Sequence, residues 1–240
     1  MDMRNQAVLV TGASRGLGRA LMEAFARRGA RVVGVARDAR ALEAAVAPLK
    51  AQGLAVHGLA FDVGDKQAIY PLVGAATALV GPLDVLINNA STLGPTPLPL
   101  LLDTACEDVS QVLEVNLLGP FRLTKAVAGS MVVRGRGLIL NITSDAAVSA
   151  YPRWGAYSVS KAALEHLTRL WASEFEGSGV RLLTVDPGDM DTRMHRDALP
   201  DADPSALAKP EDVAARILAL VEARDATSGQ RFEAAKWEAA

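Results

Sequence analysis

The sequence predicts an α/β fold in which helices cover both faces of a doubly wound, mostly parallel sheet. Short apolar segments alternate with longer Ala-, Leu- and Arg-rich segments along the chain. The short segments are apolar almost throughout, which is typical of strands buried on both faces. Strict alternation of strand and helix is typical of parallel sheets with crossover helices.

The short segments that are rich in Leu or β-branched residues are predicted as strands: 7–10, 31–35, 55–61, 83–87, 137–142 and 180–185. A short seventh strand is expected at 228–232. Helices are predicted at 18–28, 39–52, 66–80, 103–134, 156–176 and 210–223. Glycines that follow four of these helices are suited to left-handed caps: Gly29, Gly53, Gly81 and Gly177.

Composition limits the kind of protein that this chain forms. Its 240 residues are half apolar, with a net charge of −2, which fits one domain with a sizeable core. No linker or composition shift divides the chain, so we expect a single domain over 1–240. The chain has no dense basic run, no apolar run long enough to span a membrane and no signal-peptide pattern. The single cysteine and three scattered histidines have no metal-ligand spacing. We expect a cytoplasmic protein without metal, nucleic-acid or membrane partners.

The segment 187–209, rich in Asp and Pro, is predicted to be irregular. It lies between the sixth strand and the last helix. Long loops inside compact domains are usually functional, so we expect a lid over a substrate. A mobile surface loop without a function is the alternative.

A glycine-rich turn follows the first predicted strand and precedes a helix. Glycines let the backbone turn sharply and approach a pyrophosphate, and the helix N-terminus offers free N–H groups. Three residues separate the first two glycines, whereas the common dinucleotide fingerprint has one. We predict a phosphate-binding turn made of Gly12, Ser14, Arg15, Gly16, Leu17 and Gly18.

The same turn also matches the nucleophile elbow of hydrolases, with Ser14 between two glycines. A hydrolase needs an oxyanion-hole amide from an earlier strand–helix loop, and no strand precedes this one. Neither His166 nor His195 is clearly placed to act as the base. A serine hydrolase is therefore disfavoured.

Tyr157 and Lys161 lie four residues apart at the start of a predicted helix, so their side chains share one face. Free tyrosine titrates near pH 10. An ammonium about 4 Å away in a partly shielded site contributes roughly 4 kcal/mol, enough to lower the tyrosine pKa by about three units. The phenol would then exchange protons near neutral pH. Taken alone, the pair also fits an exposed helical contact.

The glycine turn and the Tyr157–Lys161 pair resemble the short-chain dehydrogenase/reductase family in its single-domain form. Further family motifs follow in order over nearly the whole chain. Asn88, Asn89 and Ala90 end the fourth strand. The later matches are Asn116, Ser144 thirteen residues before Tyr157, and the segment Pro187, Gly188, Asp189, Met190, Asp191 and Thr192. The resemblance implies a Rossmann-like fold.

The resemblance implies hydride transfer between a nicotinamide cofactor and a carbonyl or alcohol carbon. Tyr157 would exchange a proton with the substrate oxygen, and Ser144 would hydrogen-bond that oxygen. Lys161 would lower the tyrosine pKa and bind the ribose, and Asn116 would hold a water in a proton relay. Other implied cofactor-binding residues are Asp62, Val63, Asn89, Ala90, Pro187, Gly188, Met190 and Thr192. A homodimer or homotetramer is expected. A non-catalytic regulatory or scaffold protein of this fold is the alternative.

The end of the second strand predicts the choice of nicotinamide cofactor. An acidic residue there accepts from the ribose 2′-hydroxyl, whereas arginine binds a 2′-phosphate. This strand ends in Ala36 and Arg37, and Arg15 and Ser14 lie in the glycine turn. NADP(H) is therefore favoured over NAD(H), unless Arg37 pairs with Asp38 or faces solvent.

Two residues depart from the family pattern. Ser91 stands where the family usually has glycine, and Asp145 directly follows Ser144. The expected pocket walls mix aromatic, apolar and charged groups, so the sequence leaves the substrate open: Tyr151, Trp154, 93–101 and 187–209.

Overall fold

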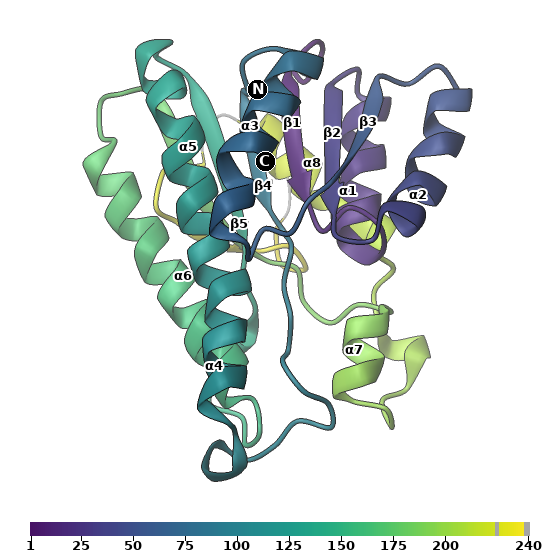
Figure 1. The fold of residues 1–240 in the computed structure, drawn as a ribbon, viewed down its shortest axis with the longest axis vertical. Helices are drawn as coiled ribbons and strands as arrows, with labels where there is room; N and C mark the ends of the chain where they lie inside the picture. Colours follow the sequence, from purple (N-terminus) through teal and green to yellow (C-terminus); the bar gives the residue numbers. More distant parts are fainter. Residues whose placement is uncertain (224–225, 238–240) are drawn as a thin grey trace.

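Seven parallel strands form one sheet in the computed structural model, which describes residues 1–223 and 226–237. The strand order is β3-β2-β1-β4-β5-β6-β7, and each neighbouring pair is parallel (Figure 1). The strands are β1 Ala7–Thr11, β2 Arg31–Ala36, β3 Val56–Ala60, β4 Val85–Asn88, β5 Gly137–Ile142, β6 Val180–Asp186 and β7 Arg231–Glu233. The predicted doubly wound sheet is confirmed.

Helices cover both faces of the sheet because side chains of each strand alternate between them. In β1, Val8 and Val10 belong to one apolar core, whereas Ala7 and Leu9 belong to the other. The first core packs against α1 Gly16–Arg27, α2 Ala39–Ala51 and α8 Pro210–Glu222. The second packs against α3 Ile69–Val80, α5 Gly119–Val133 and α6 Gly155–Glu174. No helix among the described residues is long and apolar enough to cross a membrane.

The helix predicted at 103–134 is divided into several segments. A 3-10 turn, Leu101–Asp103, precedes α4, Cys106–Leu113. A π-helical turn, Glu114–Leu118, then joins α4 to α5. Pro120 has no N–H to donate to a carbonyl in this turn, which explains why the regular bond pattern is interrupted there. The boundaries of the prediction were wrong here, although its helical character was right.

The segment 187–209 is more regular than expected. It contains α7, Arg193–Ala198, and a 3-10 turn, Pro204–Ala206. The Thr192 hydroxyl caps α7 by accepting from the His195 amide at 3.2 Å. In Figure 1, α7 and the segment 89–105 project beyond the same edge of the sheet. Both segments follow the carboxyl ends of strands, so they flank the same space.

The chain reverses its winding direction between β1 and β4, which are neighbours in the sheet. Connections from these two strands lead to opposite faces, which opens a crevice at their carboxyl ends. Ligands of doubly wound proteins bind at such a switch point. The fold thus predicts a binding site between the glycine turn after β1 and the polar residues after β4.

Candidate functional site

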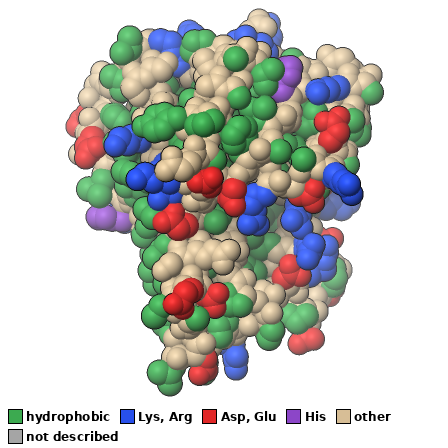
Figure 2. Space-filling view, in the orientation of Figure 1, with side chains coloured by type: hydrophobic (Ala, Val, Ile, Leu, Met, Phe, Trp, Pro, Cys, Tyr) green, Lys and Arg blue, Asp and Glu red, His purple; other side chains and the backbone are tan. Residues whose placement is uncertain are grey.

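A cleft of about 1020 Å³ opens at the carboxyl ends of the strands. Figure 2, in the orientation of Figure 1, shows charged side chains of both signs gathered across the middle of the molecule. The predicted cofactor-binding residues that line the cleft are Gly12, Ser14, Arg15, Gly16, Leu17, Gly18, Arg37, Asp62, Val63, Asn89, Ala90, Tyr157, Lys161, Pro187, Met190 and Thr192. The structure therefore brings distant motifs together. Gly188, Asn116 and Ser144 are not part of this lining.

The glycine turn can only be built from glycine at its tightest points. A Cβ on Gly18 would lie 2.2 Å from the Gly12 carbonyl oxygen, and one on Gly12 would lie 2.8 Å from Asn89 Nδ2. Gly12 also has φ +70°, which favours glycine. The helix that follows has Arg15 as its N-cap residue, and this residue makes no side-chain cap hydrogen bond. Its N-terminal amides are thus available to an anion, and the turn fits a pyrophosphate.

Thr11 connects the glycine turn to the end of β4, and the sequence analysis did not identify it. Its hydroxyl accepts from the Asn89 and Ala90 amides, both at 3.0 Å. Its carbonyl accepts from Asn89 Nδ2 at 2.8 Å. A hydroxyl at the end of an otherwise apolar strand was the available signal. These bonds fix the distance between the two cofactor motifs.

Positive charge is available at the end of β2. The Arg37 side chain is 65% exposed, and its nearest carboxylate is Asp62, 3.9 Å away. Asp38 instead caps α2, because its Oδ1 accepts from the amides of Arg40 and Ala41. The alternative pairing of Arg37 with Asp38 was wrong, whereas the exposure of Arg37 agrees with the other alternative, in which it faces solvent. Arg15 is exposed and has no ion-pair partner among the described residues.

Tyr157 and Lys161 lie on the same buried face of α6, as the helical spacing predicted. Tyr157 is 8% exposed and packs edge-on against Trp154, with ring centroids 5.7 Å apart. Lys161 Nζ lies 5.5 Å from the Tyr157 ring centroid and donates to the Ile142 carbonyl at 2.8 Å. The ammonium is thus near the tyrosine ring but bonded to the end of β5.

Burial controls the titration of both groups. It raises the pKa of Tyr157 to about 12, while the Ser144 and Ser91 hydroxyls oppose this rise. Burial also lowers the pKa of Lys161 to about 8. We expected Lys161 to lower the tyrosine pKa, but desolvation of the phenolate is the larger effect here. The phenol is therefore protonated at neutral pH.

Asn116 lies in the π-helical turn and is completely buried. Its Oδ1 accepts from the Thr92 amide at 2.8 Å, and its Nδ2 donates to the Thr92 carbonyl at 2.9 Å. Nδ2 also donates to Ser160 Oγ at 3.0 Å, and Ser160 Oγ donates to the Tyr157 carbonyl at 2.6 Å. Asn116 thus joins the segment after β4 to the first turn of α6.

Ser144 and Asp145, at the end of β5, form a hydrogen-bonded pair. Ser144 Oγ donates to Asp145 Oδ1 at 2.9 Å, and the Tyr151 hydroxyl donates to Asp145 Oδ2 at 2.8 Å. Ser91 causes no backbone strain, because the non-glycine residues with positive φ among those described are Asn5 and Arg153. Both departures change the chemistry near the cleft: Ser91 lines it and its hydroxyl lowers the pKa of Tyr157, while Asp145 accepts a hydrogen bond from Ser144.

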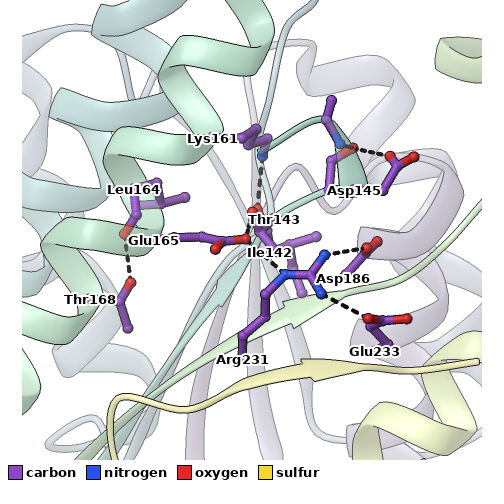
Figure 3. Close-up of polar contacts among 12 residues, drawn as sticks. Ile142, Thr143, Asp145, Lys161, Leu164, Glu165, Thr168, Asp186, Arg231 and Glu233 are labelled. Atoms are coloured by element: carbon purple, nitrogen blue, oxygen red, sulfur yellow. Dashed lines mark hydrogen bonds and ion pairs between the residues drawn. The ribbon is translucent and has the colours of Figure 1, made fainter. Parts of the chain in front are cut away.

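Charged residues that the sequence analysis missed lie behind the cleft. Arg231 on β7 forms ion pairs with Glu165 on α6 and Asp186 at the end of β6 (Figure 3). Charged residues on an otherwise buried strand or helix face were the available signal. Arg231 was not identifiable as the partner of Glu165 and Asp186, because it is distant from both in sequence.

Comparison with known proteins supports the family resemblance that the sequence motifs indicate. The short chain dehydrogenase family profile matches residues 6–203. A short chain dehydrogenase of Pseudocercospora fijiensis is 36% identical over 198 residues, which cover 80% of this chain and 62% of that protein. Gluconate 5-dehydrogenase of Gluconobacter oxydans is 37% identical over 186 residues, which cover 78% of this chain and 72% of that protein.

Solved structures match over almost the whole chain. A protein of Pseudomonas syringae described as a short chain dehydrogenase has a TM-score of 0.90 at 33% identity, covering 97% of this chain and 96% of that one. A short chain dehydrogenase of Shigella flexneri, solved in complex with NADP, has a TM-score of 0.89 at 26% identity, covering 98% and 99% of the two chains. The chain belongs to the short-chain dehydrogenase/reductase family of oxidoreductases.

Proposed function

We propose that the protein is an NADP(H)-dependent oxidoreductase that interconverts a carbonyl compound and its alcohol, with Tyr157 as the general acid and base. One observation carries the proposal. A buried phenol and a buried ammonium face one cleft, whose other end is a glycine turn suited to a pyrophosphate. Membership of a family of oxidoreductases supports it.

The proposed chemistry divides between cofactor and protein. A nicotinamide supplies or accepts the hydride when it is bound. Tyr157 holds a proton at neutral pH, because burial raises the pKa of its phenol to about 12. It donates this proton to the substrate oxygen as negative charge develops there. Lys161, 5.5 Å from the ring centroid, stabilises the phenolate that remains. The Ser144 hydroxyl hydrogen-bonds the same substrate oxygen, for which its single proton turns away from Asp145 Oδ1.

The remaining roles are assigned by position. The residues that would hold the cofactor are the cleft-lining set given above, with Gly188 shaping the turn after β6. We also propose a single domain over 1–240, in which 187–209 acts as a lid over the substrate. Met194 in this segment packs against the apolar cluster around Tyr157, which supports the lid. Cytoplasmic location and assembly as a homodimer or homotetramer stay predictions.

The proposed activity is tested by following the loss of NADPH absorbance with a panel of aldehydes and ketones. The panel pairs neutral compounds with carboxylate-bearing analogues, since the exposed Asp145 carboxylate beside Ser144 disfavours another negative charge. Turnover of a panel member supports the proposal. A regulatory or scaffold protein binds NADPH but converts no member. A serine hydrolase cleaves esters in a reaction that needs Ser14 and is indifferent to Tyr157.

Replacing Arg37 with Ala is expected to reduce the preference for NADPH over NADH at least tenfold. Arg37 is exposed beside the cleft, and a charge-assisted bond to a 2′-phosphate accounts for an effect of this size. Nicotinamide fluorescence measures both affinities. Arg40→Ala removes a nearby exposed arginine outside the cleft lining and should leave the ratio unchanged. Tighter binding of NADH than NADPH by the unmodified protein contradicts the assignment.

A further inference from the structure

Three carboxylates surround one guanidinium behind the cleft. Arg231 contacts Glu165 Oε1 through Nε at 3.0 Å, Asp186 Oδ2 through Nη2 at 2.7 Å and Glu233 Oε1 through Nη1 at 3.1 Å (Figure 3). The Glu165 and Asp186 side chains are only 5% and 8% exposed. We call these four residues the Arg231 cluster. Buried charges are costly to desolvate, so this cluster needs an explanation beyond stability.

The Glu165 side of the cluster adjoins two segments of the site. Glu165 follows Lys161 by four residues, so both project from the buried face of α6. Glu165 Oε1 also accepts from the Thr143 hydroxyl at 2.8 Å. Thr143 lies in the cleft lining and directly precedes Ser144. The Glu165 carboxylate therefore connects Arg231 to the helix that carries Tyr157 and Lys161, and to Thr143 after the end of β5.

The Asp186 side of the cluster adjoins a third segment of the site, the turn that follows β6. Asp186 is the last residue of β6, and its Oδ1 accepts from the Gly188 amide at 2.9 Å. This bond holds the turn that begins with the cleft residue Pro187. The ends of β5, β6 and β7 and the buried face of α6 are thus joined by a single guanidinium.

The cluster also places negative charge near a cation that has no ion pair of its own. Among the described residues, the hydrogen bond of Lys161 goes to the neutral Ile142 carbonyl, and no carboxylate lies within ion-pair distance of its ammonium. Burial lowers the pKa of Lys161, and the charge of Asp186 opposes this. Burial raises the pKa of Asp186 in turn, while the Gly188 amide and Arg231 oppose that rise.

The other charged groups around α6 are already engaged. Asp145 accepts from Ser144 and Tyr151. Glu114, in the adjacent π-helical turn, pairs with Arg122 at 2.6 Å. Glu165 and Glu233 share Arg231 with Asp186. Asp186 differs from them in its position: Lys161 donates to the Ile142 carbonyl, and Ile142 pairs in the sheet with Val185, the residue that directly precedes Asp186.

We propose that the Arg231 cluster positions the reacting groups: Arg231 holds Asp186 at the end of β6, where its negative charge stabilises the buried ammonium of Lys161. Asp186 and Arg231 are positioning residues, since they act through Lys161 and the turn at Pro187. The proposal rests on the proposed function, in which Lys161 works as an ammonium.

An Asp186→Asn variant tests the charge while keeping the shape and the acceptor for Gly188. NMR of protein with carbon-13 lysine follows each ammonium with pH, and Lys161→Met assigns the Lys161 signal. We expect the Lys161 pKa to fall by about 0.5 to 1 unit. Asp189→Asn, which neutralises a 75% exposed carboxylate three residues away, should leave it unchanged. An unchanged Lys161 titration in Asp186→Asn overturns the proposal.

This measurement needs neither substrate nor turnover. A shifted titration in a protein that converts no carbonyl compound supports the electrostatic link and counts against the proposed reaction. Turnover together with an unshifted Lys161 titration supports the proposed reaction and contradicts the electrostatic link. The two proposals can therefore fail separately.

The pH profile of alcohol oxidation gives a second readout. The charge of Asp186 raises the pKa of both Tyr157 and Lys161, so its removal should move both limbs of the profile toward lower pH. A purely structural role lowers the rate at every pH and leaves both limbs in place. Arg231→Lys keeps the cation and should retain more activity than Arg231→Met. If Arg231→Met fails to fold, Asp186→Asn alone decides the question.

Discussion

Replacing Tyr157 with Phe is expected to lower carbonyl reduction by about 10²- to 10⁴-fold, the range typical for loss of a positioned general acid. The substitution removes the hydroxyl that would donate the proton and keeps the ring that packs against Trp154. NADPH affinity should fall much less than the rate, because Tyr157 lines the cofactor cleft but the substitution removes no phosphate contact. Steady-state rates at saturating NADPH, together with nicotinamide fluorescence, measure the two effects separately.

Tyr70→Phe is the matched control. Tyr70 lies on α3, is 68% exposed and is outside the cleft, so the same chemical change should leave the rate unaffected. Retention of more than about a tenth of the activity by Tyr157→Phe would be incompatible with general acid catalysis by this phenol. The proton would then come from another group.

Gly18→Ala is expected to lower NADPH affinity at least tenfold and to reduce the free energy of unfolding by about 1–3 kcal/mol. The new Cβ would lie 2.2 Å from the Gly12 carbonyl oxygen and 2.5 Å from Asn89 Nδ2. The helix N-terminus must then move away from the turn, and the amides that face the anion move with it. Fluorescence titration and urea unfolding measure the two losses.

Gly74→Ala adds the same methyl group where space is available. Gly74 is exposed within α3, and no atom lies within 4 Å of the added Cβ. Alanine is favoured over glycine in a helix, so this variant should be more stable by about 0.5–1 kcal/mol, with unchanged NADPH affinity. If both variants lose affinity equally, steric crowding at the turn is not the cause.

The sequence predicted the sheet well because each strand is a short apolar run buried on both faces. For example, residues 137–142 match β5 at both ends. The π-helical turn at 114–118 was not predictable, since its cause is a bond pattern around Pro120 and Asn116 rather than hydrophobic periodicity. The helix α7 was missed because six residues with many charges show no clear apolar stripe.

Positions of the site motifs were predicted for a related reason. Parallel strands place their carboxyl ends at one edge, so motifs that end successive strands meet there. The titration of Tyr157 was not predictable, because its burial depends on Leu93 and Leu98, which come from a segment distant in sequence. Arg231 escaped notice because its partners on α6 and β6 lie 45 or more residues away.

Because the start of α1 has no side-chain cap, the stability of the folded protein should depend on the concentration of the nucleotide that binds there. No side-chain cap bonds the amides at this helix start, so a phosphate in the turn would give them a charged acceptor. Any ligand that binds the native state alone adds to its stability, by about 2.7 kcal/mol at a hundred times its dissociation constant. A depleted nucleotide pool would therefore leave a larger share of molecules open to proteolysis, independently of any effect on turnover.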